Sequence, residues 1–112
     1  FRNLGDDTFF VASLGRICEQ KLGSLWPVLP ELLGRPRFQF CLLGAAAGSD
    51  CLWVERQKSL TRFPELLSFT QYDSGVFHLV SGAADAVLMP SLIEPCGLSQ
   101  LVGLRYGSVP LV

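Results

Sequence analysis

A single acid lies between apolar residues and a tight turn near the end of the chain. Glu94 follows an apolar run at 86–90 and directly precedes Pro95, Cys96 and Gly97. The run is typical of a buried strand and a helical pattern follows the turn, so Glu94 is expected at a strand-to-helix junction. Backbone N–H groups at a helix start favour an anionic or hydroxyl-rich ligand. Glu94 is therefore either a carboxylate that binds sugar hydroxyls or stabilises positive charge, or a solvated side chain before a proline turn.

Two cations follow the first apolar run of the chain. Arg16 and Lys21 lie five positions apart, just past the run at 8–13. Arginine binds phosphate oxygens through paired hydrogen bonds and lysine acts as a compact point charge, so both side chains could contact one diphosphate. Surface cations of this kind are also common without a ligand. The chain contains no G-x-G-x-x-G and no Walker-type phosphate loop, which removes the main support for those nucleotide sites.

The remaining polar candidates are weaker. Tyr72 follows an apolar run at 66–70, where its ring could stack on a base or pack on its own domain. His78, the only histidine, has apolar neighbours and is expected to be structural. The four cysteines form no C-x-x-C pair, so we expect no metal site and reduced thiols.

The spacing of apolar runs indicates the elements that must position these residues. Expected strands are 8–13, 38–44, 66–70, 86–90 and 108–112, and expected helices are 24–34, 49–63, 74–84 and 97–107. This alternation predicts an α/β fold, a Rossmann-like doubly wound parallel sheet with right-handed crossovers. Ligands of such sheets bind at the carboxyl ends of the strands, where the loops with Arg16 and Glu94 are expected.

Local signals refine the expected helices. Ser24 and Ser74 are candidate N-caps, and Pro30 predicts a kink or a late start in 24–34. Gly107 is expected to end the last helix. One face of that helix is expected to carry Leu98, Leu101, Val102 and Leu104.

Composition bounds the class of protein. The chain has 112 residues, 49% of them hydrophobic, which fits one packed domain or part of one. A net charge of −1 and scattered Lys and Arg give no sign of capture by nucleic acid or by a membrane surface. The chain has no initiator Met and stops inside an apolar run, so we expect it to be a fragment of a longer protein.

The segment "PSLIEPCGLSQLVGLRYGSVPLV" (90–112) resembles the signature of starch and glycogen synthases, glycosyltransferase family 5. The matching positions are Pro90, Ser91, Glu94, Pro95, Cys96, Gly97, Leu98, Gln100, Arg105, Tyr106, Gly107 and Pro110. Upstream, Arg16 followed by Glu19, Gln20 and Lys21 resembles a second element of the family. The segment from Tyr72 to Asp85 has family-like spacing, so the resemblance covers most of 8–112.

The resemblance implies a fold and an activity. The fold is GT-B, two Rossmann-like domains that face each other across a cleft. Residues 1–112 would be part of the C-terminal, nucleotide-sugar-binding domain, with the N-terminal acceptor domain outside the chain. The implied reaction moves glucose, with retention, from ADP-glucose to the non-reducing end of an α-1,4-glucan. The family needs no metal, no cofactor is implied besides the donor substrate, and the fragment alone is expected to be inactive.

The resemblance also implies roles for single residues. Arg16 and Lys21 would hold the diphosphate and stabilise it as a leaving group, and Glu94 would contact the donor glucose near its reacting carbon. Residues implied to bind the donor are Tyr72, near the adenine, and Cys96, Gly97 and Leu98, through backbone N–H groups.

Some positions depart from the family, and alternatives stay open. Leu22 stands where members usually have glycine, and Leu92–Ile93 replaces a common Arg-Phe pair. The alternatives are another GT-B nucleotide-sugar transferase, a non-catalytic nucleotide- or glucan-binding relative, and a plain nucleotide-binding module. The expected compartment is the plastid stroma for a plant or algal parent and the cytoplasm for a bacterial one. The Tyr72–Asp73 pair and the absence of arginine before Glu94 lean slightly to the plastid.

Overall fold

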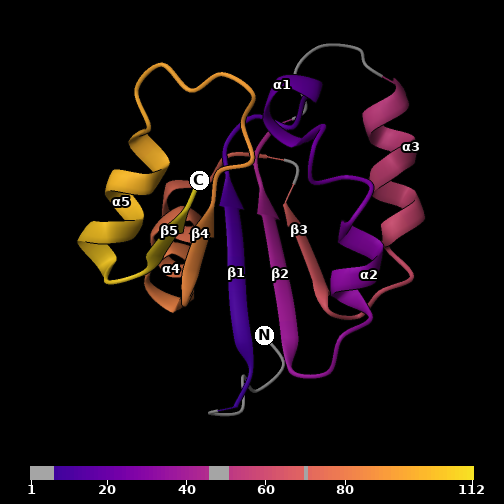
Figure 1. Ribbon diagram of the computed structural model, residues 1–112, viewed down its shortest axis with the longest axis horizontal. Helices are drawn as coiled ribbons and strands as arrows, with labels where there is room; N and C mark the ends of the chain where they lie inside the picture. Colours follow the sequence, from indigo (N-terminus) through magenta and orange to yellow (C-terminus); the bar gives the residue numbers. More distant parts are fainter. Residues whose placement is uncertain (1–6, 46–50, 70) are drawn as a thin grey trace.

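The computed structural model describes residues 7–45, 51–69 and 71–112, in which a five-stranded parallel sheet forms the centre (Figure 1). Its strands are β1 (Phe9–Leu14), β2 (Phe38–Leu43), β3 (Leu66–Phe69), β4 (Ala86–Leu88) and β5 (Val109–Leu111). The strand order is β3-β2-β1-β4-β5, with all neighbours parallel. This order confirms the predicted doubly wound sheet. The ends of each strand differ from the expected range by at most two residues.

Helices occupy each connection between the strands. They are α1 (Glu19–Leu22), α2 (Leu29–Leu33), α3 (Cys51–Leu60), α4 (Ser74–Ala83) and α5 (Leu98–Tyr106). The first connection holds two short helices. Helix α1 lies in a stretch that was expected to be a loop, whereas α2 starts late, as expected, because Pro30 fits only its first turn. Ser24 is not the cap of α2. Val28 occupies the N-cap position, and the Ser24 hydroxyl donates instead to the Pro90 carbonyl at 2.9 Å.

The cap of α4 also differs from the expectation. Asp73, rather than Ser74, is the N-cap, and its Oδ1 accepts a hydrogen bond from the Val76 N–H at 2.9 Å. A carboxylate accepts this bond more strongly than a hydroxyl, and it also faces the positive end of the helix. Gly107 ends α5 in the left-handed conformation with φ of 89°, as predicted.

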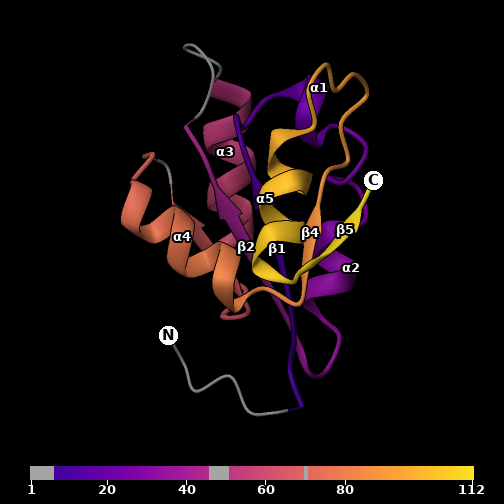
Figure 2. The same ribbon diagram turned by 90° about the vertical axis from the view of Figure 1, so that its left-hand side faces the viewer.

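Helices cover both faces of the sheet, with α2 on one side and α4 on the other (Figure 2), and an apolar core lies on each face. The core under α1, α2 and α3 contains Val11, Ile17, Leu22, Leu25, Leu29, Leu33, Phe40, Leu42, Leu60 and Ala86. The core under α4 contains Phe10, Ala12, Leu14, Cys41, Leu43, Val80, Ala84 and Val87. Successive residues of a strand point to opposite faces, so continuous apolar runs such as β1 supply both cores.

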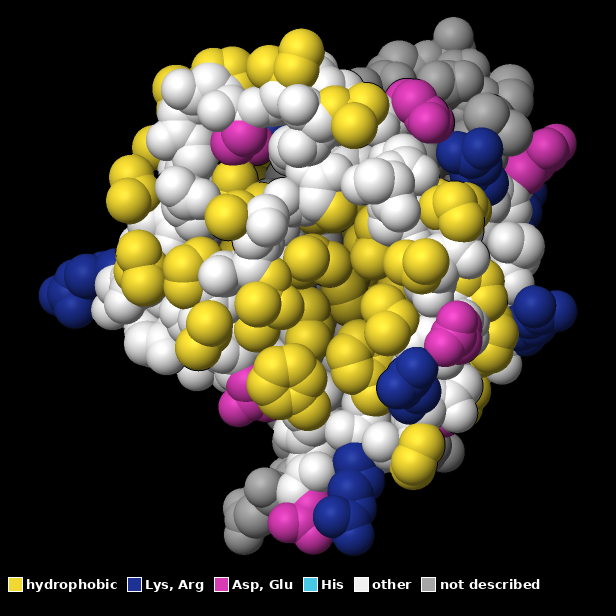
Figure 3. All heavy atoms as spheres, viewed as in Figure 1, with side chains coloured by type: hydrophobic (Ala, Val, Ile, Leu, Met, Phe, Trp, Pro, Cys, Tyr) yellow, Lys and Arg dark blue, Asp and Glu magenta, His cyan; other side chains and the backbone are white. Residues whose placement is uncertain are grey.

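Helix α5 packs on the sheet through Gly103 and not through its leucines. Gly103 is buried so close to Val87 that an added Cβ would lie 2.9 Å from a Val87 methyl group. Leu98, Leu101 and Leu104 are instead exposed, so the expected apolar face does not pack on this sheet. Hydrophobic side chains also gather in a hollow over the middle of the face seen in Figure 3, between β5 and α2. Among the described residues, no helix is long and apolar enough to span a membrane.

Candidate functional site

The strand order brings two loops together at the carboxyl ends of β1 and β4. These strands are neighbours in the sheet, with Val11 paired to Ala86 and Ala12 to Val87. The loop after β1 carries Lys21, and the loop after β4 carries Glu94. Residues that are 73 positions apart in the sequence therefore meet at the edge where parallel sheets bind ligands.

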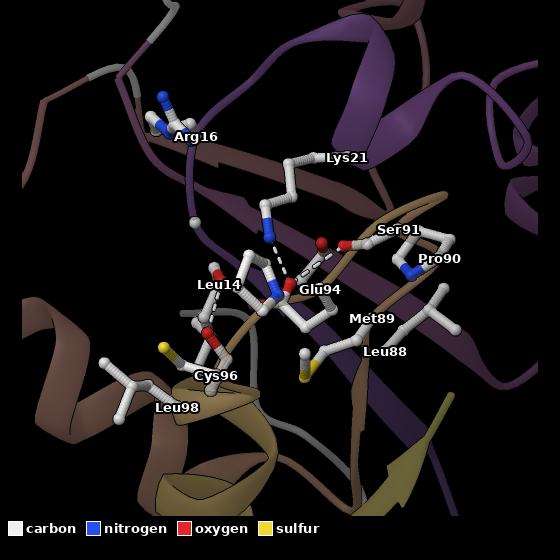
Figure 4. A pocket seen from close by; sticks show the side chains of 14 residues that line it. Leu14, Arg16, Lys21, Leu88, Met89, Pro90, Ser91, Glu94, Cys96 and Leu98 are labelled. Carbon is white, nitrogen blue, oxygen red and sulfur yellow. Dashed lines mark hydrogen bonds and ion pairs between the residues drawn. The ribbon is translucent and has the colours of Figure 1, made fainter.

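Lys21 and Glu94 form an ion pair at this edge (Figure 4). Lys21 Nζ donates to Glu94 Oε2, the Ser91 hydroxyl donates to the same oxygen at 3.1 Å, and the Gly97 N–H donates to Oε1 at 3.3 Å. The Lys21 hydrogen bond is the main cause that lowers the pKa of Glu94 below its ordinary value. Partial burial acts in the opposite direction, and Ser91 and Gly97 add to the lowering. Glu94 is therefore a carboxylate at neutral pH.

The pair remains open to solvent and to a ligand. The exposed fraction of the side chain is 19% for Lys21 and 27% for Glu94. A lysine ammonium has three donors, so Lys21 can contact a second anion while it holds Glu94. The pair thus combines a fixed positive charge and a fixed negative charge a few ångströms apart at the rim of a cavity.

Arg16 lies next to the pair but does not join it. Its guanidinium points away from Lys21 and Glu94 (Figure 4), and it makes no hydrogen bond or ion pair with another residue of the described part of the chain. It follows Gly15, whose φ of 149° turns the backbone at the end of β1. That Arg16 and Lys21 bind one diphosphate stays a prediction.

Two cavities meet around Arg16. The Glu94 cavity has a volume of about 310 Å³, and Lys21, Glu94 and Cys96 are among the residues that line it. The Tyr72 cavity has a volume of about 240 Å³ and is lined by Tyr72 and Phe77, among other residues. Both cavities are lined by Leu14, Gly15, Arg16 and Ser99. Because they share these residues, the two cavities adjoin, with Tyr72 on one side and the Lys21–Glu94 pair on the other.

Aromatic and glycine residues shape the Tyr72 cavity. The Tyr72 ring is 67% exposed and lies 5.9 Å from the Phe77 ring, centroid to centroid. The floor needs Gly44, because a Cβ there would lie 1.6 Å from the Gly15 carbonyl oxygen. Tyr72 was predicted at this edge from the sequence, and in the structure the residue is largely exposed there.

The turn from Cys96 to Leu98 offers fewer free donors than expected. Gly97 is buried with φ of 63°, and its N–H is already bound to Glu94. The N–H groups of Cys96 and Leu98 have no acceptor within the described residues. Both residues line the Glu94 cavity.

Serines complete the site, and sequence reasoning assigned them no role. Ser91 lies three positions before Glu94, a spacing typical of a side chain that bonds a nearby turn, and this signal could have identified it. Ser99 donates to the Leu14 carbonyl at 2.7 Å and ties the first turn of α5 to the end of β1. Nothing in the sequence pattern indicates that long-range bond.

The histidine that was expected to be structural lies outside the two cavities. His78 Nδ1 and the Tyr106 hydroxyl share a hydrogen bond of 2.6 Å between α4 and α5, outside both cavities. Cys18, Cys41 and Cys96 carry free thiols. No group of three or more His, Cys, Asp or Glu that could hold a metal ion occurs within 7–45, 51–69 and 71–112.

Sequence comparison relates the chain to bacterial glycogen synthases, although no family model matches it. It is 42% identical over 99 residues to the glycogen synthase of Aeromonas salmonicida, covering 87% of the chain and 20% of the relative. It is 41% identical over 113 residues to that of Rhodopseudomonas palustris, covering 98% of the chain and 22% of the relative. The chain thus spans about one fifth of these relatives. Both are bacterial and give no support to the lean toward a plastid.

Structural comparison agrees. The catalytic domain of starch synthase IV from Arabidopsis thaliana, solved with ADP and acarbose, is 28% identical with a TM-score of 0.80, covering 98% of the chain and 23% of that protein. HepE from Anabaena, solved with UDP-glucose, is 20% identical with a TM-score of 0.75, covering 96% of the chain and 30% of that protein, and shows the shared fold alone. These matches confirm the predicted Rossmann-like part of a GT-B glycosyltransferase. Sequence and fold together show that the chain belongs to the glycogen and starch synthase family.

Proposed function

We propose that the protein to which this chain belongs is a retaining glucosyltransferase that moves glucose from ADP-glucose to the non-reducing end of an α-1,4-glucan. The chain would supply the donor-binding side of the active site. The observation that carries the proposal is the pair of adjoining cavities, which present Tyr72 on one side, Arg16 between them and the Lys21–Glu94 pair on the other. The related starch synthase IV was solved with ADP and acarbose, which supports the same assignment.

The three parts of ADP-glucose correspond to three parts of this surface. The adenine would lie in the Tyr72 cavity, where the exposed ring offers a face for stacking. The diphosphate would cross Gly15 and Arg16 toward Lys21. The glucose would lie beside Glu94, with the N–H groups of Cys96 and Leu98 directed at its hydroxyls or at the nearby phosphate. The Gly97 N–H would reach the donor only after it leaves Glu94.

The charges of the site suit the bond that must break. When the bond between the anomeric carbon and the diphosphate oxygen breaks, the electron pair stays on the diphosphate and positive charge develops on the sugar ring. Lys21 and Arg16 would stabilise the leaving diphosphate, and the Glu94 carboxylate would stabilise the ring. The proposal assigns the neutralising charges to these side chains and includes no metal and no cofactor.

Other parts of the protein would supply the acceptor side. We propose that residues outside 1–112 bind the α-1,4-glucan, as an N-terminal domain of a GT-B enzyme would. Transfer would then need the whole protein, while binding of the donor can be measured on this chain. The bacterial relatives favour the cytoplasm as its compartment.

Calorimetric titration of the folded chain with ADP-glucose, ADP and UDP-glucose tests the proposal. We expect ADP-glucose to bind, Arg16→Ala and Glu94→Ala to weaken that binding, and Lys58→Ala, an exposed cation on α3, to leave it unchanged. Addition of EDTA should not alter the affinity. Tighter binding of UDP-glucose than of ADP-glucose would favour another GT-B transferase. Absence of binding by a demonstrably folded chain would contradict the proposed donor site.

A further inference from the structure

We propose that Gln20 and Ser24 are positioning residues, which fasten the loop 90–94 (the acid loop) to residues 17–25 in and around α1 (the α1 segment) and thereby hold Glu94 against Lys21. Their hydrogen bonds to the loop would set the distance between the Lys21 ammonium and the Glu94 carboxylate. Its importance for donor binding rests on the proposed function, but the fastening itself does not.

Hydrogen bonds join the acid loop to the α1 segment along the length of the loop. The Ser24 hydroxyl donates to the Pro90 carbonyl at 2.9 Å, at the start of the loop. The Leu92 N–H donates to the Gln20 carbonyl at 2.9 Å, and Gln20 Nε2 donates to the Ile93 carbonyl at 3.3 Å. Gln20 therefore contacts the loop with both its main chain and its side chain.

The register of these contacts places the charged pair. Gln20 meets Ile93, and the next residue on each segment, Lys21 and Glu94, forms the ion pair. Glu94 directly follows Ile93 in the loop, so a loop that shifts away from Gln20 also moves the Glu94 carboxylate away from Lys21. The bonds from Ser91 and Gly97 would move with Glu94, since both donors lie on its own side of the gap.

The acid loop has little apolar packing to hold it. The side chains of Leu92 and Ile93 are 70% and 64% exposed, so burial contributes little to the position of this part of the loop. A loop with few buried contacts opens locally at low cost, and its position then depends on its polar contacts. Besides the Lys21–Glu94 pair itself, the side chains of Gln20 and Ser24 provide such contacts.

The α1 segment, by contrast, is fixed to the body of the protein. Ile17, Leu22 and Leu25 are buried in the core beneath it. Glu19 also accepts an ion-pair contact from Arg56 of α3 at 3.2 Å. The α1 segment is therefore held in place by the core, and the position of the acid loop depends on its hydrogen bonds to that segment.

Titration of the Glu94 carboxyl by NMR in the 112-residue chain tests the proposal. In the double variant Gln20→Ala/Ser24→Ala, the pKa of Glu94 should rise toward its ordinary value, because Lys21 would spend less time bound to it. Amide exchange at Leu92 should accelerate as well, because the loop would open more often. The substitutions keep the Gln20 carbonyl that accepts from the Leu92 N–H, so faster exchange would report movement of the loop and not loss of the acceptor. Ser24→Thr retains the hydroxyl, so it should leave the pKa of Glu94 closer to its value in the native chain than Ser24→Ala does.

Ile93→Ala is the matched control, since it shortens an exposed side chain of the same loop and leaves the Ile93 carbonyl in place. It should change neither the Glu94 titration nor the exchange at Leu92. An unchanged pKa of Glu94 together with unchanged exchange at Leu92 in the double variant would overturn the proposal.

Neither readout uses a nucleotide, so failure of this inference and failure of the proposed function are distinguishable. If both hold, the double variant should also raise the dissociation constant for ADP-glucose on the order of tenfold. If the double variant binds ADP-glucose more weakly but the pKa of Glu94 is the same as in the native chain, the positioning role is contradicted. The proposed donor site would then still stand.

Discussion

Lys21 and Glu94 form an ion pair that joins the loop after β1 to the loop after β4 across 73 positions of sequence. The protein's own loops place these two charges of the proposed donor site side by side. Preorganised charges need no rearrangement when a substrate binds, which is the condition under which electrostatic stabilisation is most effective.

Lys21→Met should raise the pKa of Glu94 toward its ordinary value. In the native chain the folded-state pKa of Glu94 lies below its unfolded value, so the pair stabilises the fold above the unfolded pKa. That stabilisation is lost as the pH falls through the folded-state pKa. Because the pair is partly exposed, we expect an effect of about 1 kcal/mol or less on the free energy of unfolding.

Urea unfolding at pH 7 and at pH 3 would measure this effect. The stability difference between the native chain and Lys21→Met should shrink at the lower pH. Lys58→Met, which removes an exposed cation of α3, should show the same difference at both pH values. A Lys21→Met deficit that persists unchanged at pH 3 would contradict the assigned cause.

Tyr72→Ala should weaken ADP-glucose binding and leave the fold intact. The ring is 67% exposed, so its removal should change the free energy of unfolding by no more than about 0.5 kcal/mol. Loss of a stacking ring should raise the dissociation constant for ADP-glucose on the order of tenfold. Leu79→Ala, an equally exposed apolar side chain on α4, is the calorimetric control. Equal affinity in Tyr72→Ala and the native chain would place the adenine elsewhere.

Gly44→Ala should destabilise the chain by about 2 kcal/mol or more. The new Cβ would collide with the main chain of Gly15, so the ends of β1 and β2 would have to separate. Gly34→Ala is the matched comparison, because its Cβ would meet neighbours at ordinary distances of 3.6 Å and beyond. Thermal unfolding of both variants measures the difference, and similar midpoints would show that the close approach is not maintained in solution.

The described thiols should differ sharply in reactivity. Burial raises the pKa of Cys41 to about 12, so at pH 8 only about one thiol in ten thousand is the reactive thiolate. Cys96 is exposed beside the Glu94 cavity and should be alkylated readily. Peptide mapping after iodoacetamide treatment locates the modified residues. ADP-glucose should protect Cys96, and fast labelling of Cys41 in the native chain would contradict its burial.

Much of the fold could be predicted from local patterns. Continuous apolar runs located every strand of the described sheet, including the short β3, because strands that are buried on both faces need apolar residues at successive positions. Gly107 marked the end of α5, because only a residue without Cβ adopts its conformation at low cost. The predicted caps Ser24 and Ser74 were wrong. The Ser24 hydroxyl donates to the Pro90 carbonyl, 66 positions along the chain, which no local cap rule examines. Asp73 directly precedes Ser74 and is itself a favoured cap residue, so the second error was a shift of one position.

For the site, the sequence by itself determined which residue types are available and that each follows a strand. Arg16, Lys21 and Glu94 were all named from these signals. The tertiary structure alone decided their relations: Lys21 binds Glu94, Arg16 points away, and Gly97 donates to Glu94 instead of remaining free. The reason is that these contacts depend on β4 lying beside β1. Strand order is set by the packing of whole helices on both faces of the sheet, and no local stretch of sequence encodes it.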